Sequence, residues 1–370
     1  MTIFFHIGTP KTGTTALQRF LAANRETLAE LGYDFPSFLG EENHAKLAAY
    51  ALEPSRDVGL KIEMKLTDED ARQEFNATLE RDFEEAVSAK GDYIFSSEHC
   101  TTYLAEESEL SRLKSLVTAT GQDVRLIVYF REPVSYLVSR FSTNLKQGRT
   151  NTIRVPPGKN LDRWYDYPMI VDLWSKVFGR DSLTIRLFSK DHLKSGDIRH
   201  DFCQVLGLQE SALDFGYATD PMANRSVDYL VGSFLLEMNR LVPRYVDQRI
   251  NPLRGELAVL CEVVSNREGI LVPEDIVTQM NDLLRDPMAR FNRDYLGGPF
   301  ASPFAPYSPE GKCAMRRLTR KEYMEIFADI WTAKIAMEKS IDLSALSAVH
   351  ADAAMQKVRS GSRNGDRVLV

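Results

Sequence analysis

The first fifteen residues constrain the fold more than any other part of the chain. A short, apolar, β-rich run at residues 3–7 is followed by the glycine-bearing stretch GTPKTGTT at residues 8–15. Beyond it, apolar side chains recur at helical spacing over residues 15–31. A strand, a glycine-containing loop and a helix in this order are typical of a phosphate-binding loop, where free N–H groups at the start of the helix bind an anion.

The lysine of this loop does not stand where a nucleoside triphosphate loop has it. In the Walker A pattern, G-x-x-x-x-G-K-[ST], a lysine follows the second glycine and reaches the terminal phosphates. Gly8 and Gly13 have the required spacing, but Thr14 follows Gly13, and the lysine is Lys11, inside the loop. We therefore predict an anion-binding loop that serves a nucleotide other than ATP.

Three further apolar runs predict buried strands, at residues 93–97, 124–130 and 182–188. Helical stretches separate them, among them the amphipathic run at residues 75–90. Strands that alternate with helices predict an α/β fold with a central parallel sheet flanked by helices. In such sheets ligands bind at the carboxyl ends of the strands.

Beyond about residue 225 the pattern is mostly helical, and a loop rich in proline and glycine at residues 297–309 interrupts it. The predicted helices cover residues 229–241, 253–264, 273–284 and 320–339. We predict a nucleotide-binding α/β core at residues 1–225 and a helical extension at 226–350 that packs on it. Residues 351–370 lack periodicity and are predicted to form a loose tail.

Composition excludes several classes of function. A net charge of -6 argues against a general nucleic-acid binder, which needs a dense basic surface. We see neither a basic leader nor an apolar run of 18 residues, so we expect no membrane span and a cytoplasmic location. The four cysteines, Cys100, Cys203, Cys261 and Cys313, are scattered without a C-x-x-C pair, which predicts free thiols and no metal site.

A second motif, VYFREPVSYLVSRF at residues 128–141, follows the predicted strand at 124–130. Arg131 stands at the carboxyl end of that strand, and Pro133 is well suited to the first turn of a helix. Ser139 follows Arg131 by about two helical turns. A guanidinium at a strand end can bind a phosphate with two N–H groups, and a serine hydroxyl can donate to the same phosphate.

The two motifs together resemble the sulfotransferase family, which uses 3′-phosphoadenosine 5′-phosphosulfate as donor. The resemblance is carried by PKTGTT after an N-terminal strand and by R-x-P with a serine eight residues after the arginine. It covers roughly residues 3–21 and 93–141, with weaker support at 186–208. It implies a P-loop NTPase-like sulfotransferase fold of the bacterial carbohydrate type, with no metal required.

The resemblance also implies the roles of the motif residues. The 5′-phosphosulfate would be held by Lys11, Thr12, Gly13, Thr14 and Thr15, and the 3′-phosphate by Arg131 and Ser139. Sulfuryl transfer needs no metal-binding hydroxyl, but it does need charge stabilisation on the departing phosphate. A lysine within the loop is suited to that, so Lys11 is implied as the stabiliser of the leaving group.

The reaction also needs a base to take the proton of the acceptor. Glu98, in YIFSSEHC, directly follows a predicted strand and resembles the strand-end glutamate of carbohydrate-type sulfotransferases. His99 and His44 are the alternatives, since related enzymes use histidine. His6 lies inside the first predicted strand and is expected to pack in the core. Asn224 and Arg225 and the aromatic residues within 160–168 are weaker candidates for ligand contacts.

The sequence thus predicts a cytoplasmic, bacterial sulfotransferase that moves a sulfuryl group to a hydroxyl or amine, with a carbohydrate as the favoured acceptor. One alternative is a P-loop kinase or nucleoside triphosphatase with an unusual loop. The other is a non-catalytic nucleotide-binding protein on the same fold. The identity of the acceptor and the oligomeric state do not follow from the sequence.

Overall fold

The computed structural model describes residues 1–56, 58–87, 91–216, 226–246 and 249–339. The chain divides into two compact units. The first comprises Met1–Phe141, Ile153–Pro221 and Val272–Pro309, and the second comprises Ser142–Thr152, Met222–Leu271 and Glu310–Val370. The predicted boundaries at residues 225 and 350, the predicted tail, and the candidates Asn224 and Arg225 lie outside the described residues.

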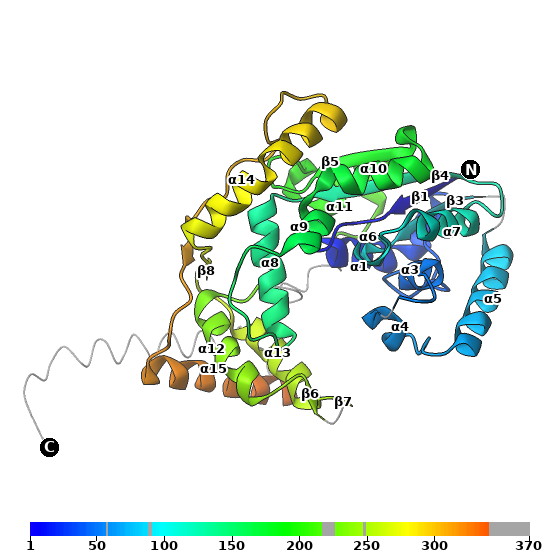
Figure 1. Ribbon diagram of the computed structural model, residues 1–370. Coiled ribbons are helices and arrows are strands. Elements are labelled where there is room, and N and C mark those ends of the chain that lie inside the picture. Colours follow the sequence, from blue (N-terminus) through cyan, green and yellow to red (C-terminus); the bar gives the residue numbers. More distant parts are fainter. Residues whose placement is uncertain (57, 88–90, 217–225, 247–248, 340–370) are drawn as a thin grey trace, which may run out of the picture. The chain divides into compact units, whose positions relative to one another are not determined.

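The first unit is built on a five-stranded sheet in the order β2-β3-β1-β4-β5, and every neighbouring pair in it is parallel (Figure 1). The strands are β1 (Thr2–His6), β2 (Tyr33–Asp34), β3 (Asp92–Ser96), β4 (Asp123–Phe130) and β5 (Leu183–Leu187). The predicted fold class is confirmed, and all four predicted strands are present within a residue or two of their expected bounds. The short edge strand β2 was not predicted.

Both faces of the sheet are buried, because successive side chains of a strand point to opposite faces. Phe5 of β1 contributes to one core cluster, while Ile127 and Tyr129 of β4 contribute to the other. The first cluster contains residues of the helices α3 (Ala45–Ala51), α4 (Gly59–Glu63), α5 (Glu69–Ala86), α6 (Glu98–Tyr103), α7 (Glu107–Val117), α8 (Pro133–Lys146), α9 (Gly158–Tyr165), α10 (Tyr167–Phe178) and α14 (Glu274–Phe291). The second cluster contains residues of α1 (Thr14–Ala23), α2 (Arg25–Glu30) and α11 (Ile198–Leu206).

The helix predicted at residues 15–31 is divided in two at Asn24. The Asn24 amide donates to the carbonyl oxygens of Phe20 and Asp214, at 2.9 and 3.0 Å, and its Oδ1 accepts from the Asp214 backbone N–H at 2.7 Å. A buried asparagine that competes for helix carbonyls in this way ends the helix. The partner is 190 residues away along the chain, so local spacing could not predict the break.

The predicted helices of the C-terminal third are present, with one difference in length. Helix α14 continues past the predicted end at residue 284 to Phe291, through Pro287, and is followed by a π-helical turn at Asn292–Leu296. The second unit contains α12 (Tyr229–Leu241), α13 (Pro252–Val264), α15 (Arg320–Glu338) and the strand pairs β6–β7 (Tyr245–Val246, Arg249–Ile250) and β8–β9 (Gly269–Ile270, Lys312–Cys313). The loop predicted at residues 297–309 contains neither helix nor strand.

Candidate active site

The loop between β1 and α1 is held in an unusual backbone conformation. Lys11 has a φ of +68° and Gly13 a φ of +76°, both in the left-handed region. A Cβ added to Gly13 would lie 3.0 Å from Cε2 of Phe188, and this close contact together with the positive φ favours glycine there. The Thr12 hydroxyl donates to the carbonyl of Thr9 at 2.6 Å, which closes the loop on itself. The loop is therefore a fixed structure, and its one non-glycine residue at positive φ is the predicted catalytic lysine.

The first turn of α1 is suited to an anion. Its N-cap is Gly13, which makes no side-chain cap hydrogen bond, and no acidic residue stands in the first turn. By contrast, the N-caps Asp68 of α5 and Asp197 of α11 accept backbone N–H groups with their side chains. The unsatisfied N–H groups and the positive end of the helix dipole at Thr14 and Thr15 favour a negative group at this position.

Arg131 brings the second motif into direct contact with the first. Its Nη1 donates to the carbonyl oxygen of Lys11 at 3.1 Å, across 120 residues of sequence. The guanidinium also lies over the ring of Phe188, 5.8 Å from its centroid. The Tyr167 hydroxyl donates to the Arg131 carbonyl. Burial lowers the pKa of Arg131 from its ordinary value. Ser139 is buried on α8, the helix that begins just after Arg131.

Glu98 begins helix α6, directly beyond the end of β3, at the predicted edge of the sheet. Its Oε2 accepts from the side-chain amides of Gln18 at 2.7 Å and Asn43 at 2.8 Å. The Glu98 side chain keeps 19% of its surface exposed, and Oε1 lies 3.9 Å from Nδ1 of His99. Glu98, the favoured base candidate, and His99, one of the two alternatives, therefore lie close to each other.

A threonine links this carboxylate to the loop. The Thr101 hydroxyl, on α6, donates to the carbonyl oxygen of Gly8. Because Thr101 lies within one turn of Glu98, this bond fixes the start of α6 against the loop that carries Lys11. Thr101, Gln18 and Asn43 were not among the residues predicted from the sequence. The only available signal was their proximity in sequence to Glu98, Lys11 and His44, which does not identify a contact.

His44 and His6 are buried rather than open to an acceptor. His44 is fully buried, stacks on Phe35 with ring centroids 4.5 Å apart, and accepts the Ser96 N–H on Nδ1 at 3.2 Å. His6 is also fully buried, with Nδ1 2.8 Å from Oγ of Ser96. Desolvation by burial lowers the pKa of each to about 3. His44 therefore fits a packing role better than that of a base, and His6 lies in the core as expected.

The two buried histidines predict a loss of stability at mildly acid pH. Their folded-state pKa values lie below the unfolded value of about 6.5, so below pH 6.5 the unfolded chain binds protons that the folded chain does not. Each histidine should cost about 2 kcal/mol of the free energy of unfolding between pH 7 and pH 5. Urea unfolding at the two pH values measures this, and His44→Gln should remove about half of the pH dependence. Equal stability at both pH values would contradict the prediction.

The remaining residues singled out in the sequence are the aromatic side chains within 160–168 and the cysteines. Tyr165 and Tyr167, from the aromatic cluster at 160–168, are buried in the core beside the sheet. The four cysteines are free, as predicted. Among the described residues, no group of three or more His, Cys, Asp or Glu side chains could hold a metal ion. Within that same part of the chain, no helix is long and apolar enough to cross a membrane.

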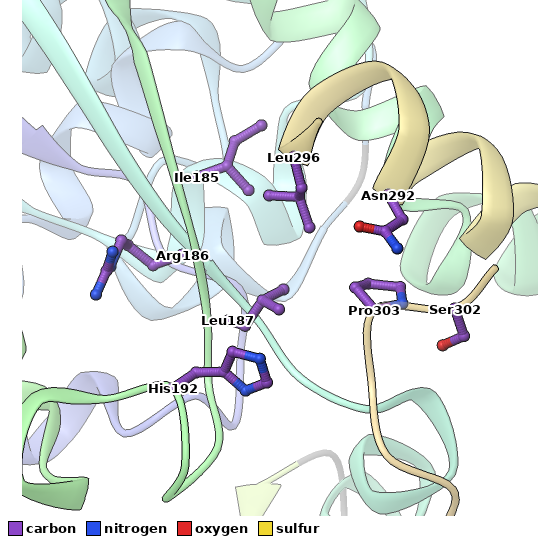
Figure 2. A pocket seen from close by; sticks show the side chains of 8 residues that line it. All are labelled: Ile185, Arg186, Leu187, His192, Asn292, Leu296, Ser302 and Pro303. Atoms are coloured by element: carbon purple, nitrogen blue, oxygen red, sulfur yellow. The ribbon is translucent and has the colours of Figure 1, made fainter. Parts of the chain in front are cut away.

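A pocket of about 420 Å³ lies beside β5 and the end of α14 (Figure 2). Its lining residues are Ile185, Arg186, Leu187, His192, Asn292, Leu296, Ser302 and Pro303. Figure 2 shows the Arg186 side chain directed away from Asn292 and Ser302, and its guanidinium pairs with Asp201 instead. The pocket contains none of the predicted site residues, so we do not assign it to the site described above.

Comparison with known proteins gives limited information. No family model matches the sequence, and no curated protein matches it. Among solved structures, the chain is similar to the crystal structure of a sulfotransferase from Alicyclobacillus acidocaldarius, with 15% sequence identity and a TM-score of 0.38. The similarity covers 79% of this chain and 95% of that chain. Similarity at this level does not establish an activity, and the function proposed below rests on the chain's own residues.

Proposed function

We propose that this chain is a sulfotransferase that moves a sulfuryl group from 3′-phosphoadenosine 5′-phosphosulfate to a hydroxyl or amine. The observation that carries the proposal is the hydrogen bond from Arg131 to the backbone of Lys11, because it joins the two motifs of the resemblance at one edge of the sheet. Glu98 stands at the end of a neighbouring strand. A loop for an anion, a half-buried cation and a carboxylate suit transfer of an anionic group.

The residues present fit such a donor. The uncapped first turn of α1 and the loop amides offer N–H groups to a 5′-phosphosulfate, with Thr12, Gly13, Thr14 and Thr15 in contact with it. The Arg131 guanidinium and the Ser139 hydroxyl would hold the 3′-phosphate. When bound, the donor supplies a sulfuryl group joined to a phosphate that departs as adenosine 3′,5′-bisphosphate. No metal is required by this arrangement.

Two side chains would carry the chemistry. Glu98 takes the proton of the acceptor as the new S–O or S–N bond forms, and His99 is the alternative base. Lys11 stabilises the negative charge that develops on the bridging oxygen as the old S–O bond breaks. We further propose that the acceptor is a carbohydrate and that the protein acts in the cytoplasm of a bacterium.

Calorimetric titration tests the donor assignment directly. Adenosine 3′,5′-bisphosphate should bind in the absence of magnesium, and at least tenfold more tightly than ADP or ATP, because only it offers a phosphate to Arg131 and Ser139. Tight binding of ATP that depends on magnesium would instead support a P-loop kinase or nucleoside triphosphatase. Tight binding of the bisphosphate without transfer to any of a panel of glycans would favour a non-catalytic nucleotide-binding protein.

Arg131→Ala provides the matched variant for this titration. It should weaken binding of adenosine 3′,5′-bisphosphate by about 10- to 100-fold, since a charge-assisted hydrogen bond contributes about 1.5–3 kcal/mol. Arg125→Ala is the control, because Arg125 is exposed on the same strand, β4. Equal affinity in the two variants would remove Arg131 from the 3′-phosphate site.

A further inference from the structure

Two amide side chains converge on a single oxygen of Glu98. Nε2 of Gln18 lies 2.7 Å from Oε2, and Nδ2 of Asn43 lies 2.8 Å from the same atom. Gln18 is only 3% exposed, so its amide is removed from solvent together with the bond it makes. Two N–H donors on one carboxylate oxygen fix the rotamer of the side chain and leave the other oxygen, Oε1, for a reacting partner.

Gln18 couples the carboxylate to the anion-binding loop. It lies on α1, one helical turn beyond Thr14, so its amide reaches Glu98 from the helix that the loop begins. The hydroxyl of Thr101 joins the same two segments from the other side, through the carbonyl of Gly8. The position of Oε2 is therefore set relative to the loop and not only relative to β3.

Asn43 is held in place from several directions. Its Oδ1 lies 3.4 Å from the Ser97 hydroxyl, and its Nδ2 lies 3.4 Å from Nδ1 of His99. The next residue, His44, is anchored on β3, where its N–H donates to the Ser96 carbonyl at 2.9 Å. A Cβ at Gly40, whose φ is +136°, would lie 2.1 Å from the Asn43 carbonyl oxygen, so the turn before Asn43 requires glycine.

We propose that Gln18 and Asn43 are positioning residues for the base, holding Oε2 of Glu98 so that Oε1 takes the proton of the acceptor. This role rests on the proposed sulfotransferase function. Neither amide is expected to touch the donor or the acceptor, so both act only through Glu98. In this proposal the buried His44 also has a role, because its packing anchors the segment that carries Asn43.

A double-mutant cycle tests the role. Gln18→Met removes the donor with little change of shape, and it should lower kcat about 10- to 100-fold, the loss expected when a catalytic group is misplaced. The affinity for adenosine 3′,5′-bisphosphate and the KM for the acceptor should change less than twofold. In a Glu98→Gln background, Gln18→Met should cause no further loss, because the residue it positions is already absent.

The chain offers a closely matched control. Gln73 donates from Nε2 to Oε1 of Glu69 at 2.8 Å, the same chemistry on the exposed surface of α5. Gln73→Met should leave kcat unchanged. Asn43→Leu is the second test variant, to be used where Gln18→Met lowers the melting temperature by more than a few degrees.

The outcomes separate the two hypotheses. If the wild type transfers no sulfuryl group to any acceptor, the proposed function fails and the positioning role fails with it. If the wild type transfers and Gln18→Met keeps its full kcat, only the positioning role is overturned. An equal loss in the wild-type and Glu98→Gln backgrounds overturns it as well, because the amide would then act independently of the carboxylate.

Discussion

Replacing Lys11 by alanine should abolish sulfuryl transfer, with a loss of about 10³-fold or more in kcat, equivalent to about 4 kcal/mol of transition-state stabilisation. The reason is that Lys11 supplies a cation inside the loop, where, under the proposed function, charge would develop on the departing phosphate. Binding of adenosine 3′,5′-bisphosphate should weaken much less, because the loop amides and Arg131 remain. Single-turnover assays with labelled donor, alongside calorimetry, measure the two effects separately.

The backbone conformation at Lys11 makes Lys11→Gly a suitable control for the alanine variant. Its φ of +68° strains alanine as much as lysine, whereas glycine adopts it readily. Lys11→Gly therefore removes the ammonium while relieving the strain, and should lose as much activity as Lys11→Ala without losing stability. If Lys11→Gly retained near-normal turnover, the defect of the alanine variant would come from the backbone, and Lys11 would not stabilise the leaving group.

Glu98→Gln should lower kcat by about 10²- to 10⁴-fold, the usual contribution of a general base. The substitution keeps the shape of the side chain, so the affinity for adenosine 3′,5′-bisphosphate should stay within a factor of two of the wild type. Steady-state kinetics with a saturating acceptor, combined with nucleotide titration, gives both quantities.

His99→Asn distinguishes the two neighbouring base candidates. His99 approaches Oε1 of Glu98 only at 3.9 Å, so its loss should have the smaller effect if Glu98 is the base. Near-normal turnover in Glu98→Gln, with a large loss in His99→Asn, would transfer the role to the histidine.

Much of the fold could be predicted from the sequence because its determinants are local. Apolar β-rich runs define β1, β3, β4 and β5, and the rule that parallel strands end at one edge places Lys11, Glu98 and Arg131 at that edge. The break in the first helix could not be predicted in this way. It depends on a contact between Asn24 and Asp214, which are distant in sequence and carry no characteristic pattern.

The same distinction applies to the candidate site. Lys11 and Arg131 stand in recognisable motifs, but Gln18 and Asn43 do not, because a single amide side chain has no signature until its partner is known. Their bonds to Glu98 span 80 and 55 residues. His44 was a candidate base because it is a histidine near these residues, but it is fully buried, and this environment does not suit a base. The acceptor remains unpredicted, since acceptor pockets are built by variable loops.

The hydrogen bond between Arg131 and the Lys11 carbonyl also has a consequence for how a donor is recognised. One guanidinium donates to the backbone of the loop and stands where the 3′-phosphate is proposed to bind, so we expect occupancy at one end of the nucleotide to change the affinity at the other end. Such coupling is reciprocal: each phosphate would change the affinity for the other by the same factor. Where the coupling is favourable, selectivity for the doubly phosphorylated nucleoside would exceed the sum of two separate contacts.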